Sequence, residues 1–546
     1  MKVAEAVGRA LVAAGVGRVF GVVGSGNFHL TNAMVAAGAP FVAARHEGGA
    51  ATMADAYARM SGTLAALSVH QGCGLTNAMT GIAEAAKSRT PLLVLAAEVT
   101  EPRSNFYVDQ AALARSVGAV PARVTAAGTA VEEACAAVAT AVRERRTVLL
   151  NLPLAVQAED VPADVLAGVV PPPERAAVEP DRAEVAAFVE LLERAERPVF
   201  VAGRGSRSQG SREALERLGD TYGALLATSA VARGLFHDNP WSLDVSGGFA
   251  SPLAADLIGR ADLIVGWGCA LNMWTMRHGR LIAPGATVVQ IDDDAAALGA
   301  HREIRLGITG DVATTARMAL ASAGEQRRGY RTTEVGANLA SKLCWRDVPY
   351  QDTGTADRID PRTLSIALDD LLPAERVLAV DSGNFMGYPS MYLSVPDDNG
   401  FCFTQAFQSI GLGLATAIGA ALAQPDRLPV AALGDGGALM SAAELDTVRR
   451  LRLPMLVVVY NDDAYGAEVH HFGPDGQVLD TVRFPPTDIA AIGHGYGFEA
   501  VTVRTTDDLE PVERWLAGPR ATPLLLDAKV VADRGAWWLE EAFRGH

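Results

Sequence analysis

The sequence lacks the features that are typical of secreted proteins and of membrane proteins. Among 546 residues there are only five cysteines, with no C-x-x-C pair, which argues against both a disulfide framework and a zinc site (Cys73, Cys135, Cys269, Cys344 and Cys402). No stretch approaches the roughly 20 uninterrupted apolar residues of a membrane span. The first residues carry charges where a signal peptide has its apolar run. We therefore expect a cytoplasmic protein with no membrane partner.

The sequence is also short of positive charge. Its 47 Lys and Arg residues against 63 Asp and Glu residues give a formal net charge of -16. Such a field does not attract nucleic acid or an anionic membrane surface, so no nucleic-acid partner is expected. The hydrophobic fraction of 49% and the charged fraction of 20% are those of an ordinary globular protein with ample core material.

Short apolar runs alternate with helix-length segments along most of the chain. This pattern predicts an α/β fold in which each domain has a doubly wound parallel sheet. A proline-bearing stretch at 153–180 and a polar stretch at 321–360 interrupt the pattern and are predicted to be linkers. The sequence therefore predicts three domains, over residues 1–160, 185–325 and 358–546.

Two clusters in the third domain follow predicted strands. Gly434-Asp435-Gly436-Gly437 ends one apolar run, and the segment 461–466, which reads Asn-Asp-Asp-Ala-Tyr-Gly, ends the next. Because ligands of open α/β sheets bind outside the carboxyl ends of the strands, we expect both clusters at one site. Glycines let main-chain N–H groups approach a phosphate, and Asp435 with a second oxygen ligand could hold Mg²⁺. The alternative is an Asp-Gly turn followed by an acidic loop.

The spacing of these clusters resembles the thiamine diphosphate (ThDP) binding motif of the ThDP-dependent enzyme family, which includes acetolactate synthases and benzoylformate decarboxylase. The resemblance implies Mg²⁺ bound by Asp435, by Asp462 and by the main-chain carbonyl of Ala464. Family members often have Asn at the second position, so Asp462 is a departure and Asn461 is the rival ligand. A second acidic ligand strengthens cation binding but adds like-charge repulsion without the metal. The diphosphate would lie against Gly434, Gly436, Gly437, Tyr465 and Gly466.

A second segment carries the same resemblance. Arg45–Ala58 is similar to the family's strand-to-helix junction, where a glutamate at the position of Glu47 hydrogen-bonds N1′ of the cofactor's aminopyrimidine. That role requires a carboxyl group within hydrogen-bond reach of the nitrogen. The alternative for Glu47 is a carboxylate stabilised by the dipole of a helix N-terminus. Because both segments match one family, the resemblance implies that Glu47 is catalytic.

Further segments resemble parts of the family that contact the cofactor. Residues 408–419 are similar to the segment whose large apolar residue bends ThDP, which implies that role for Ile410, with ordinary core packing as the alternative. Residues 381–385 resemble the strand-end loop that helps to hold the diphosphate, and this loop contains Gly383 and Asn384. On the first domain, the resemblance implies cofactor contacts for Gly24, Ser25 and Asn77.

Two residues are candidates for contact with the substrate. His70 lies where benzoylformate decarboxylase has an acid–base histidine, and histidine suits proton transfer near neutral pH. Gln110 resembles the glutamine that polarises the substrate in acetolactate synthases. A buried, satisfied histidine and a surface helix residue are the respective alternatives. The segment after His70 departs from the synthases at Cys73, where they have proline, and we expect Cys73 to be structural.

The resemblance also bears on subunits and on a second cofactor. In the family the glutamate of one subunit meets the diphosphate domain of another, which implies a homodimer or homotetramer with active sites between subunits. Acetolactate synthases also carry FAD in the central domain. The Arg-Phe-Asp-Asp-Arg stretch typical of FAD-binding members is missing from the comparable region, 269–277. FAD is therefore possible but not favoured, although the strand-end glycines at 203–205 and 310 could approach a dinucleotide.

The resemblance implies a ThDP- and Mg-dependent enzyme that decarboxylates a small-molecule 2-oxo acid to a carbanion or enamine. Adding this species to a carbonyl acceptor would make the protein an acetolactate synthase-like carboligase, which is the leading hypothesis. Protonating it would make the protein a simple decarboxylase, which a catalytic His70 would favour. A non-catalytic ThDP-binding homologue is the third hypothesis, against which the intact Glu47 and Asp435 argue. No G-x-G-x-x-G follows the first strand of any domain, so a nicotinamide oxidoreductase is not indicated.

Overall fold

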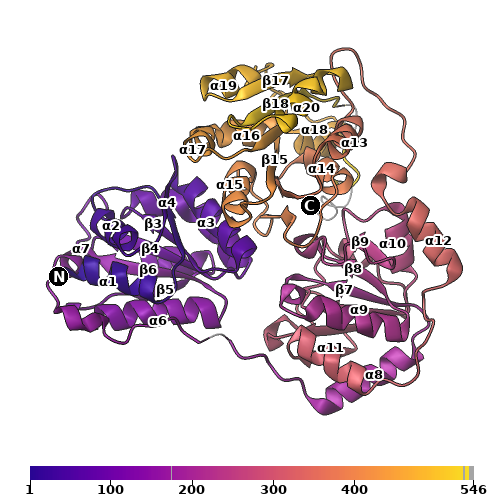
Figure 1. Ribbon diagram of the computed structural model, residues 1–546, viewed down its shortest axis with the longest axis horizontal. Helices are drawn as coiled ribbons and strands as arrows, with labels where there is room; N and C mark the ends of the chain where they lie inside the picture. Colours follow the sequence, from indigo (N-terminus) through magenta and orange to yellow (C-terminus); the bar gives the residue numbers. More distant parts are fainter. Residues whose placement is uncertain (174, 533–534, 540–546) are drawn as a thin grey trace.

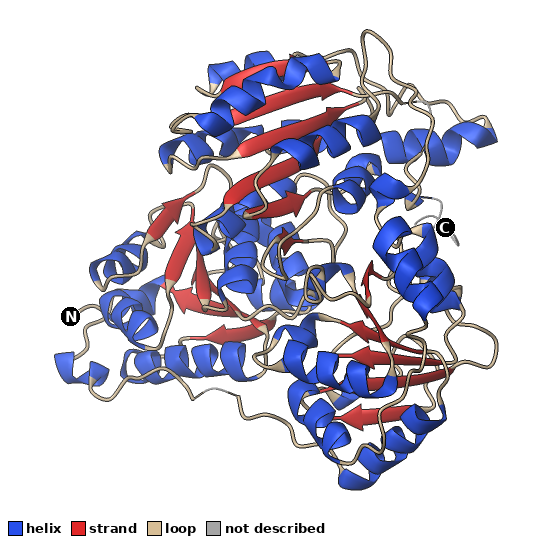
Figure 2. Ribbon diagram, turned by 45° about the vertical axis from the view of Figure 1, so that its right-hand side comes forward, coloured by secondary structure: helices blue, strands red, loops and turns tan. Residues whose placement is uncertain are grey.

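The structure of the protein is a computed structural model that describes residues 1–173, 175–532 and 535–539. It contains three six-stranded sheets that follow one another along the chain (Figures 1 and 2). Every pairing between neighbouring strands of these sheets is parallel, and helices flank the sheets. The predicted fold class is confirmed. The limits of the three domains stay predictions, and residues 540–546 of the third lie outside the described residues.

The first sheet has the strand order β2-β1-β3-β4-β6-β5. Its inner strands are continuous apolar runs, as expected when both faces of a parallel sheet are covered. The strands are β1 (Arg18–Gly21), β2 (Phe41–Ala43), β3 (Ala65–Val69), β4 (Leu92–Glu98), β5 (Val120–Arg123) and β6 (Thr147–Pro153). The α-helices are α1 (Val3–Ala13), α2 (Phe28–Ala36), α3 (Glu47–Ser61), α4 (Cys73–Lys87), α5 (Gln110–Ser116), α6 (Ala130–Arg143) and α7 (Leu154–Gln157).

The second sheet has the order β12-β11-β10-β7-β8-β9. Its strands are β7 (Pro198–Ala202), β8 (Leu225–Thr228), β9 (Ser242–Val245), β10 (Leu263–Trp267), β11 (Thr287–Asp292) and β12 (Leu306–Thr309). The helices of this part of the chain are α8 (Arg182–Arg194), α9 (Ser211–Tyr222), α10 (Pro252–Gly259), α11 (Val312–Ala321) and α12 (Thr333–Lys342). The last of these helices lies inside the predicted second linker, which is therefore not wholly irregular.

The third sheet has the order β14-β13-β15-β16-β18-β17. Its strands are β13 (Arg376–Val380), β14 (Phe401–Cys402), β15 (Leu428–Gly434), β16 (Leu456–Asn461), β17 (Glu499–Val503) and β18 (Leu524–Lys529). The helices are α13 (Pro361–Leu371), α14 (Gly387–Tyr392), α15 (Gly413–Ala423), α16 (Asp435–Met440), α17 (Leu445–Arg450), α18 (Gly466–Phe472), α19 (Ile489–Gly495) and α20 (Glu510–Ala517).

Sheet order brings the predicted site segments together at the carboxyl ends of adjacent strands. In the first sheet, β2, β1 and β3 are neighbours, and the segments with Glu47, Ser25 and His70 follow them. In the third sheet, β13, β15 and β16 are neighbours, and the segments that follow them contain Asn384, Asp435 and Asp462. This edge is where open parallel sheets bind ligands.

The first and third domains share one apolar core, whereas the central domain has cores of its own. Helix α3 packs against α15 of the third domain, and the two lie side by side in Figure 1. The approach is close because Gly419 has no side chain: a Cβ atom there would clash with the main-chain oxygen of Met53. The first and third domains are therefore held directly against each other. Among the described residues, no helix has the length and apolar character needed to cross a membrane.

Candidate functional site

The ends of β15 and β16 enclose a small cavity beside Asp435. It has a volume of about 310 Å³ and is lined by polar residues of both strand ends, including Asn461 and Tyr465, and by apolar side chains of α16 and Phe484. Asp435 is the first residue of α16 and is only 7% exposed. The structure therefore places both halves of the predicted motif at one site.

Two carboxylates meet at this site. Burial raises the pKa of Asp435 to about 6. Burial, with the charge of Asp435 added to it, raises the pKa of Asp462 to about 8. A divalent cation bound between them would relieve this repulsion, so the pair fits Mg²⁺. Among the described residues, no group of three or more His, Cys, Asp or Glu side chains is placed to hold a metal ion, but the predicted set needs only two carboxylates and the carbonyl oxygen of Ala464.

The rival ligand, Asn461, is already engaged within the protein. Its Oδ1 accepts a hydrogen bond from the amide of Asp463 (3.1 Å), and its Nδ2 donates to Oδ1 of Asp527 (2.8 Å). Asn461 is 1% exposed. The carboxylate of Asp462 instead lies over Gly466, where a Cβ atom would clash with it. These contacts favour Asp462 as the metal ligand.

The loop after β13 completes the predicted diphosphate site. Gly383 has a φ of 133°, a conformation that favours glycine, and an ideal Cβ on Gly466 would lie 3.2 Å from Cβ of Asn384. The side chain of Asn384 accepts a hydrogen bond from the amide of Ala536 (2.9 Å), so the C-terminal segment rests on this loop. Gly383 and Asn384 thus lie beside the second half of the motif, as the resemblance implies.

Asp381 is a residue of this site that sequence reasoning did not assign a role. Its fully buried carboxylate accepts hydrogen bonds from the amides of Ser382 (2.8 Å), Gly411 (2.9 Å) and Leu412 (3.2 Å). Burial raises its pKa to about 6. A Cβ on Gly437 would clash with this carboxylate, so the glycine is needed for close packing. The signal was present in the sequence, because Asp381 directly follows a predicted strand.

Ile410 lies between these elements. It is half-buried in the loop before α15, and the neighbouring Gly411 packs against Met440 of α16. The predicted bending residue is therefore close to the helix that begins with Asp435. Whether it contacts a cofactor stays a prediction.

Glu47 and Asn77 form the centre of the first-domain cluster. Glu47 is the first residue of α3, and its Oε2 accepts a hydrogen bond from Nδ2 of Asn77 (3.1 Å). Its Oε1 lies over Gly74, 3.4 Å from where a Cβ would stand, and the same Cβ would lie 3.0 Å from His70. The predicted catalytic glutamate and histidine therefore face the same glycine at the start of α4.

His70 is held by contacts on both ring nitrogens. Nδ1 lies 3.0 Å from the carbonyl oxygen of Gln71, and Nε2 lies 3.4 Å from the hydroxyl of Ser25. Phe106 packs edge-on against the ring, with centroids 5.3 Å apart. Gly24 covers one side, because a Cβ there would clash with the ring. Since a carbonyl oxygen only accepts, Nδ1 carries the proton and Nε2 is the nitrogen directed to Ser25.

Gln110 is buried and bonded within the first domain. It is 2% exposed, its Oε1 accepts a hydrogen bond from the amide of Gly72 (3.2 Å), and its Nε2 donates to Oδ1 of Asn151 (2.8 Å). The amide therefore fixes the turn before α4, and the alternative of a surface helix residue is wrong. The substrate-polarising role of Gln110 stays a prediction.

Glu444 is a further residue that the sequence analysis missed. It belongs to the third domain, is 2% exposed, and accepts hydrogen bonds from the amides of Arg45 (3.1 Å) and His46 (3.0 Å), directly before Glu47. A Cβ on Gly49 would press against it. The junction that carries Glu47 is therefore fixed by a carboxylate of another domain.

A larger cavity of about 580 Å³ lies between the three domains. The strand-end glycines Gly203 and Gly205 line it together with Arg204, Arg59 and Trp538. This is the part of the central domain for which the sequence raised FAD. The cofactor expectation, with FAD not favoured, stays a prediction.

Comparison with known proteins assigns these segments to one family. Family models described as the N-terminal TPP binding domain, the central domain and the C-terminal TPP binding domain of thiamine pyrophosphate enzymes match residues 1–113, 185–319 and 381–528. All the predicted site residues fall within the first and last of these ranges.

Individual relatives are similar over most of their length. A sulfoacetaldehyde acetyltransferase of Rhodobacter capsulatus is 28% identical, with 95% of this chain and 92% of the relative covered. A probable 2-ketoarginine decarboxylase of Pseudomonas aeruginosa is 29% identical, with coverages of 93% and 90%. An acetolactate synthase large subunit of Parasynechococcus marenigrum is 27% identical, with coverages of 89% and 80%. The relatives thus differ in the reactions that their names give.

Proposed function

The chain belongs to the thiamine pyrophosphate enzyme family, within the acetolactate synthase and decarboxylase type, and from this premise we propose that it decarboxylates a 2-oxo acid and releases an aldehyde. The proposal takes ThDP and Mg²⁺ as cofactors. The observation that carries it is the arrangement of His70, whose Nε2 is directed to the Ser25 hydroxyl and whose Cβ lies against Gly74, the glycine that the Glu47 carboxyl group also faces. A histidine so placed can deliver the proton that ends a simple decarboxylation.

The residues of the third domain would hold the cofactor. Asp435, Asp462 and the carbonyl of Ala464 would bind Mg²⁺, and the glycine-rich strand ends would bring main-chain N–H groups to the diphosphate (Gly383, Gly434, Gly436, Gly437 and Gly466, with Asn384 and Tyr465). When bound, ThDP would supply the electron sink that makes the loss of CO₂ favourable.

The residues of the first-domain cluster would bind and transfer protons. Asn77 holds one oxygen of the Glu47 carboxyl group, which keeps the other directed over Gly74. The carbonyl of Gln71 fixes the tautomer of His70, so that Nε2 can accept a proton from the Ser25 side and return it. Gly24, which packs on the imidazole, keeps that ring in place.

Carboligation is the second candidate function. The names of the sulfoacetaldehyde acetyltransferase and acetolactate synthase relatives support it, because they describe a group transfer and a synthesis and not a simple decarboxylation. Gln110, for which the synthase resemblance implies a polarising role, is buried and bonded within the protein, and this weighs against carboligation. We therefore place decarboxylation first.

The test is turnover of a panel of 2-oxo acids with ThDP and Mg²⁺ in D₂O, including short, aromatic and cationic members. An aldehyde with deuterium at its carbonyl carbon is expected, and a carbon–carbon coupled product in its place would assign the protein to the carboligases. His70→Ala is expected to lower kcat by roughly a hundredfold or more. His494→Ala is the matched control, because its Nδ1 also contacts a main-chain carbonyl (Phe498, 3.3 Å) but His494 lies in α19 of the third domain, whereas His70 belongs to the first.

A separate variant tests whether the protein only binds ThDP without catalysing a reaction. Glu47→Gln is expected to retain ThDP binding and to lose turnover, because the amide cannot exchange a proton as the carboxyl group does. Undiminished turnover in this variant would contradict the role of Glu47.

The proposed enzyme is a homodimer or homotetramer with active sites between subunits. In support, the described residues that line the cavity beside Asp435 all belong to the third domain, so the residues of the first-domain cluster are not part of its wall. The test mixes the inactive variants Glu47→Gln and Asp435→Ala after dissociation. Recovered activity is expected if two chains build one site, and its absence together with a monomeric mass in solution would overturn the arrangement.

A further inference from the structure

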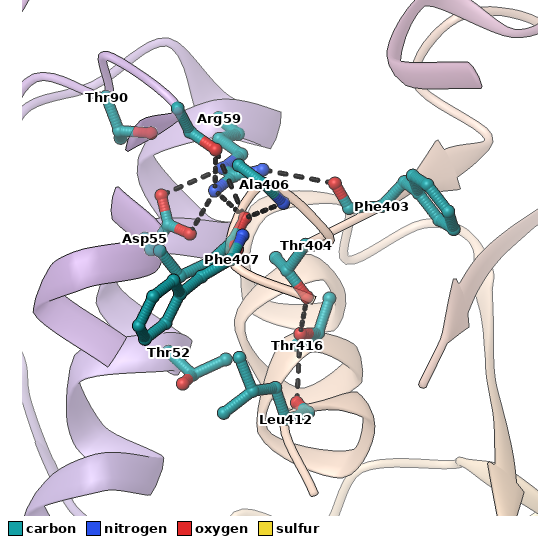
Figure 3. A network of polar contacts seen from close by, with 12 residues as sticks. Thr52, Asp55, Arg59, Thr90, Phe403, Thr404, Ala406, Phe407, Leu412 and Thr416 are labelled. Atoms are coloured by element: carbon teal, nitrogen blue, oxygen red, sulfur yellow. Dashed lines mark hydrogen bonds and ion pairs between the residues drawn. The ribbon is translucent and has the colours of Figure 1, made fainter. Parts of the chain in front are cut away.

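A buried cluster of charges joins the first domain to the third near the C-terminal half of α3. The carboxylates of Asp55 and Glu84 are fully buried, and the side chain of Arg59 between them is 9% exposed. Arg59 forms an ion pair with each, at 2.8 Å for Glu84, and Ser88 also donates to Glu84 (3.1 Å). Figure 3 shows Asp55 and Arg59 directed toward the loop that contains Ala406 and Phe407.

The cluster holds the main chain of that loop, which precedes α15. Oε1 of Glu84 accepts a hydrogen bond from the amide of Ala406 (3.1 Å), and Oε2 accepts one from the amide of Phe407 (2.6 Å). Arg59 donates to the carbonyl of Phe403 (3.1 Å). Hydrogen bonds to ionised groups are shorter and stronger than those between neutral groups. A carboxylate of one domain thus fixes two consecutive peptide groups of another.

Glu84 is ionised in this position. Burial pushes the pKa of its carboxyl group up, but Arg59 and the amides of Phe407 and Ala406 outweigh burial and hold the pKa below its usual value. A buried ion pair is not an efficient source of stability, because desolvation of both charges offsets much of their attraction. The contacts of Glu84 are therefore better explained by the geometry that they impose.

The loop before α15 has a backbone conformation that requires stabilising contacts. Gln408 has a φ of 58°, in the left-handed region that non-glycine residues rarely occupy, and Gly411 has a φ of 85°. The side chains from Ala406 to Gln408 are exposed, with the ammonium group of Lys87 5.4 Å from the ring centroid of Phe407, so burial in a core does not fix this part of the loop. At its far end, Asp381 accepts hydrogen bonds from Gly411 and the next residue. Ile410 lies between the two buried carboxylates.

We propose that Glu84 is a positioning residue, which holds the amides of Ala406 and Phe407 and thereby sets where Ile410 meets the cofactor. The inference rests on the proposed function, in which Ile410 contacts bound ThDP. Without the carboxylate, the strained turn at Gln408 relaxes, and Ile410 moves away from α16. The first domain would then tune cofactor affinity in the third through a residue that touches no cofactor atom.

The test compares two isosteric variants of the full-length protein. Glu84→Gln removes the acceptor for one of the two loop amides, since an amide NH₂ group cannot accept from an N–H. Asp55→Asn is the matched control, because Asp55 is equally buried and also pairs with Arg59 but, among the described residues, accepts no hydrogen bond from an amide of the loop. The dissociation constant for ThDP with Mg²⁺ is measured by tryptophan fluorescence without substrate. Hydrogen exchange of the peptide 403–412 is measured alongside it.

Glu84→Gln is expected to weaken ThDP binding by roughly tenfold or more and to accelerate exchange at residues 406–411, with kcat at saturating ThDP changed far less. Asp55→Asn is expected to lose comparable thermal stability without either effect. If Glu84→Gln does not fold, Glu84→Asp keeps the charge beside Arg59 but withdraws it from the loop, and the same two effects are expected.

Two outcomes would overturn the inference, and they differ from each other. If the Glu84 variants match Asp55→Asn in ThDP binding and in hydrogen exchange, and the wild type binds ThDP, the positioning role is wrong and the proposed function stays intact. A wild-type chain that binds no ThDP would overturn the proposed function and the cofactor role of Glu84 together.

Discussion

Asn77 donates a hydrogen bond to Glu47 across the start of two helices, α4 and α3, at a distance of 3.1 Å. The bond fixes one carboxyl oxygen of the residue on which the proposed chemistry depends. The donor, Asn77, has an exposed side chain, so the geometry of the hydrogen bond depends on the position of helix α4, to which Asn77 belongs. The pair therefore offers a direct test of how closely Glu47 must be oriented.

Asn77→Ala is expected to lower kcat by roughly tenfold with ThDP affinity nearly unchanged, because the carboxyl group stays but is no longer oriented. Asn77→Asp is expected to lower kcat further, because a second carboxyl group beside Glu47 disfavours the ionised form of Glu47. Steady-state kinetics and ThDP titration of both variants provide the measurement. Equal kcat in Asn77→Ala and wild type would show that the bond does not matter to turnover.

Gln110→Ala is expected to destabilise the fold by about 2–3 kcal/mol, because it leaves the amide of Gly72 and the side chain of Asn151 without their buried partner. Chemical unfolding measures the loss. If Gln110 polarised a substrate instead, the variant would keep its stability and lose kcat, and that result would contradict a purely structural role.

The buried carboxyl group of Asp381 makes stability depend on pH. Its pKa in the folded protein is about 6, above the ordinary value of 3.8, so the folded state binds the proton more tightly. Its contribution to the free energy of unfolding is fully present below about pH 4 and is lost as pH rises through about 6. The total change is about 3 kcal/mol.

Asp381→Asn isolates this contribution, since other groups titrate in the same range. The free energy of unfolding of the wild type minus that of the variant is expected to fall as pH rises from 4.5 to 7.5. A difference independent of pH would contradict the assignment. The variant is also expected to bind ThDP more weakly, because an NH₂ group would face one of the loop amides.

Much of the fold could be predicted because its inner strands are fully buried apolar runs separated by helices. The strands that escaped prediction are short or partly exposed, such as Phe41–Ala43 and Phe401–Cys402, and are recognisable only once their neighbours are in place. Motif spacing located Glu47 and Asp435 because the local strand ends carry that information.

The contacts that prediction missed depend on distant partners. The side chain of Gln110 is bonded to Asn151, a neighbour that no local pattern identifies. Glu84 and Glu444 contact main-chain amides 322 and 399 residues away along the chain. The only local sign of Glu84 is one charge inside the small, apolar run from Gly81 to Ala86.

Each of the two domains is thus held by a carboxylate of the other. Glu84 of the first domain binds a loop of the third, and Glu444 of the third domain binds the junction of the first that contains Glu47. This exchange, with the shared core, couples the two domains mechanically, because displacing either one moves a carboxylate that holds the other. The central domain is attached differently: it has two cores of its own, and it meets the third domain through Val245 and Phe249 and through largely buried ion pairs such as Arg207–Asp398.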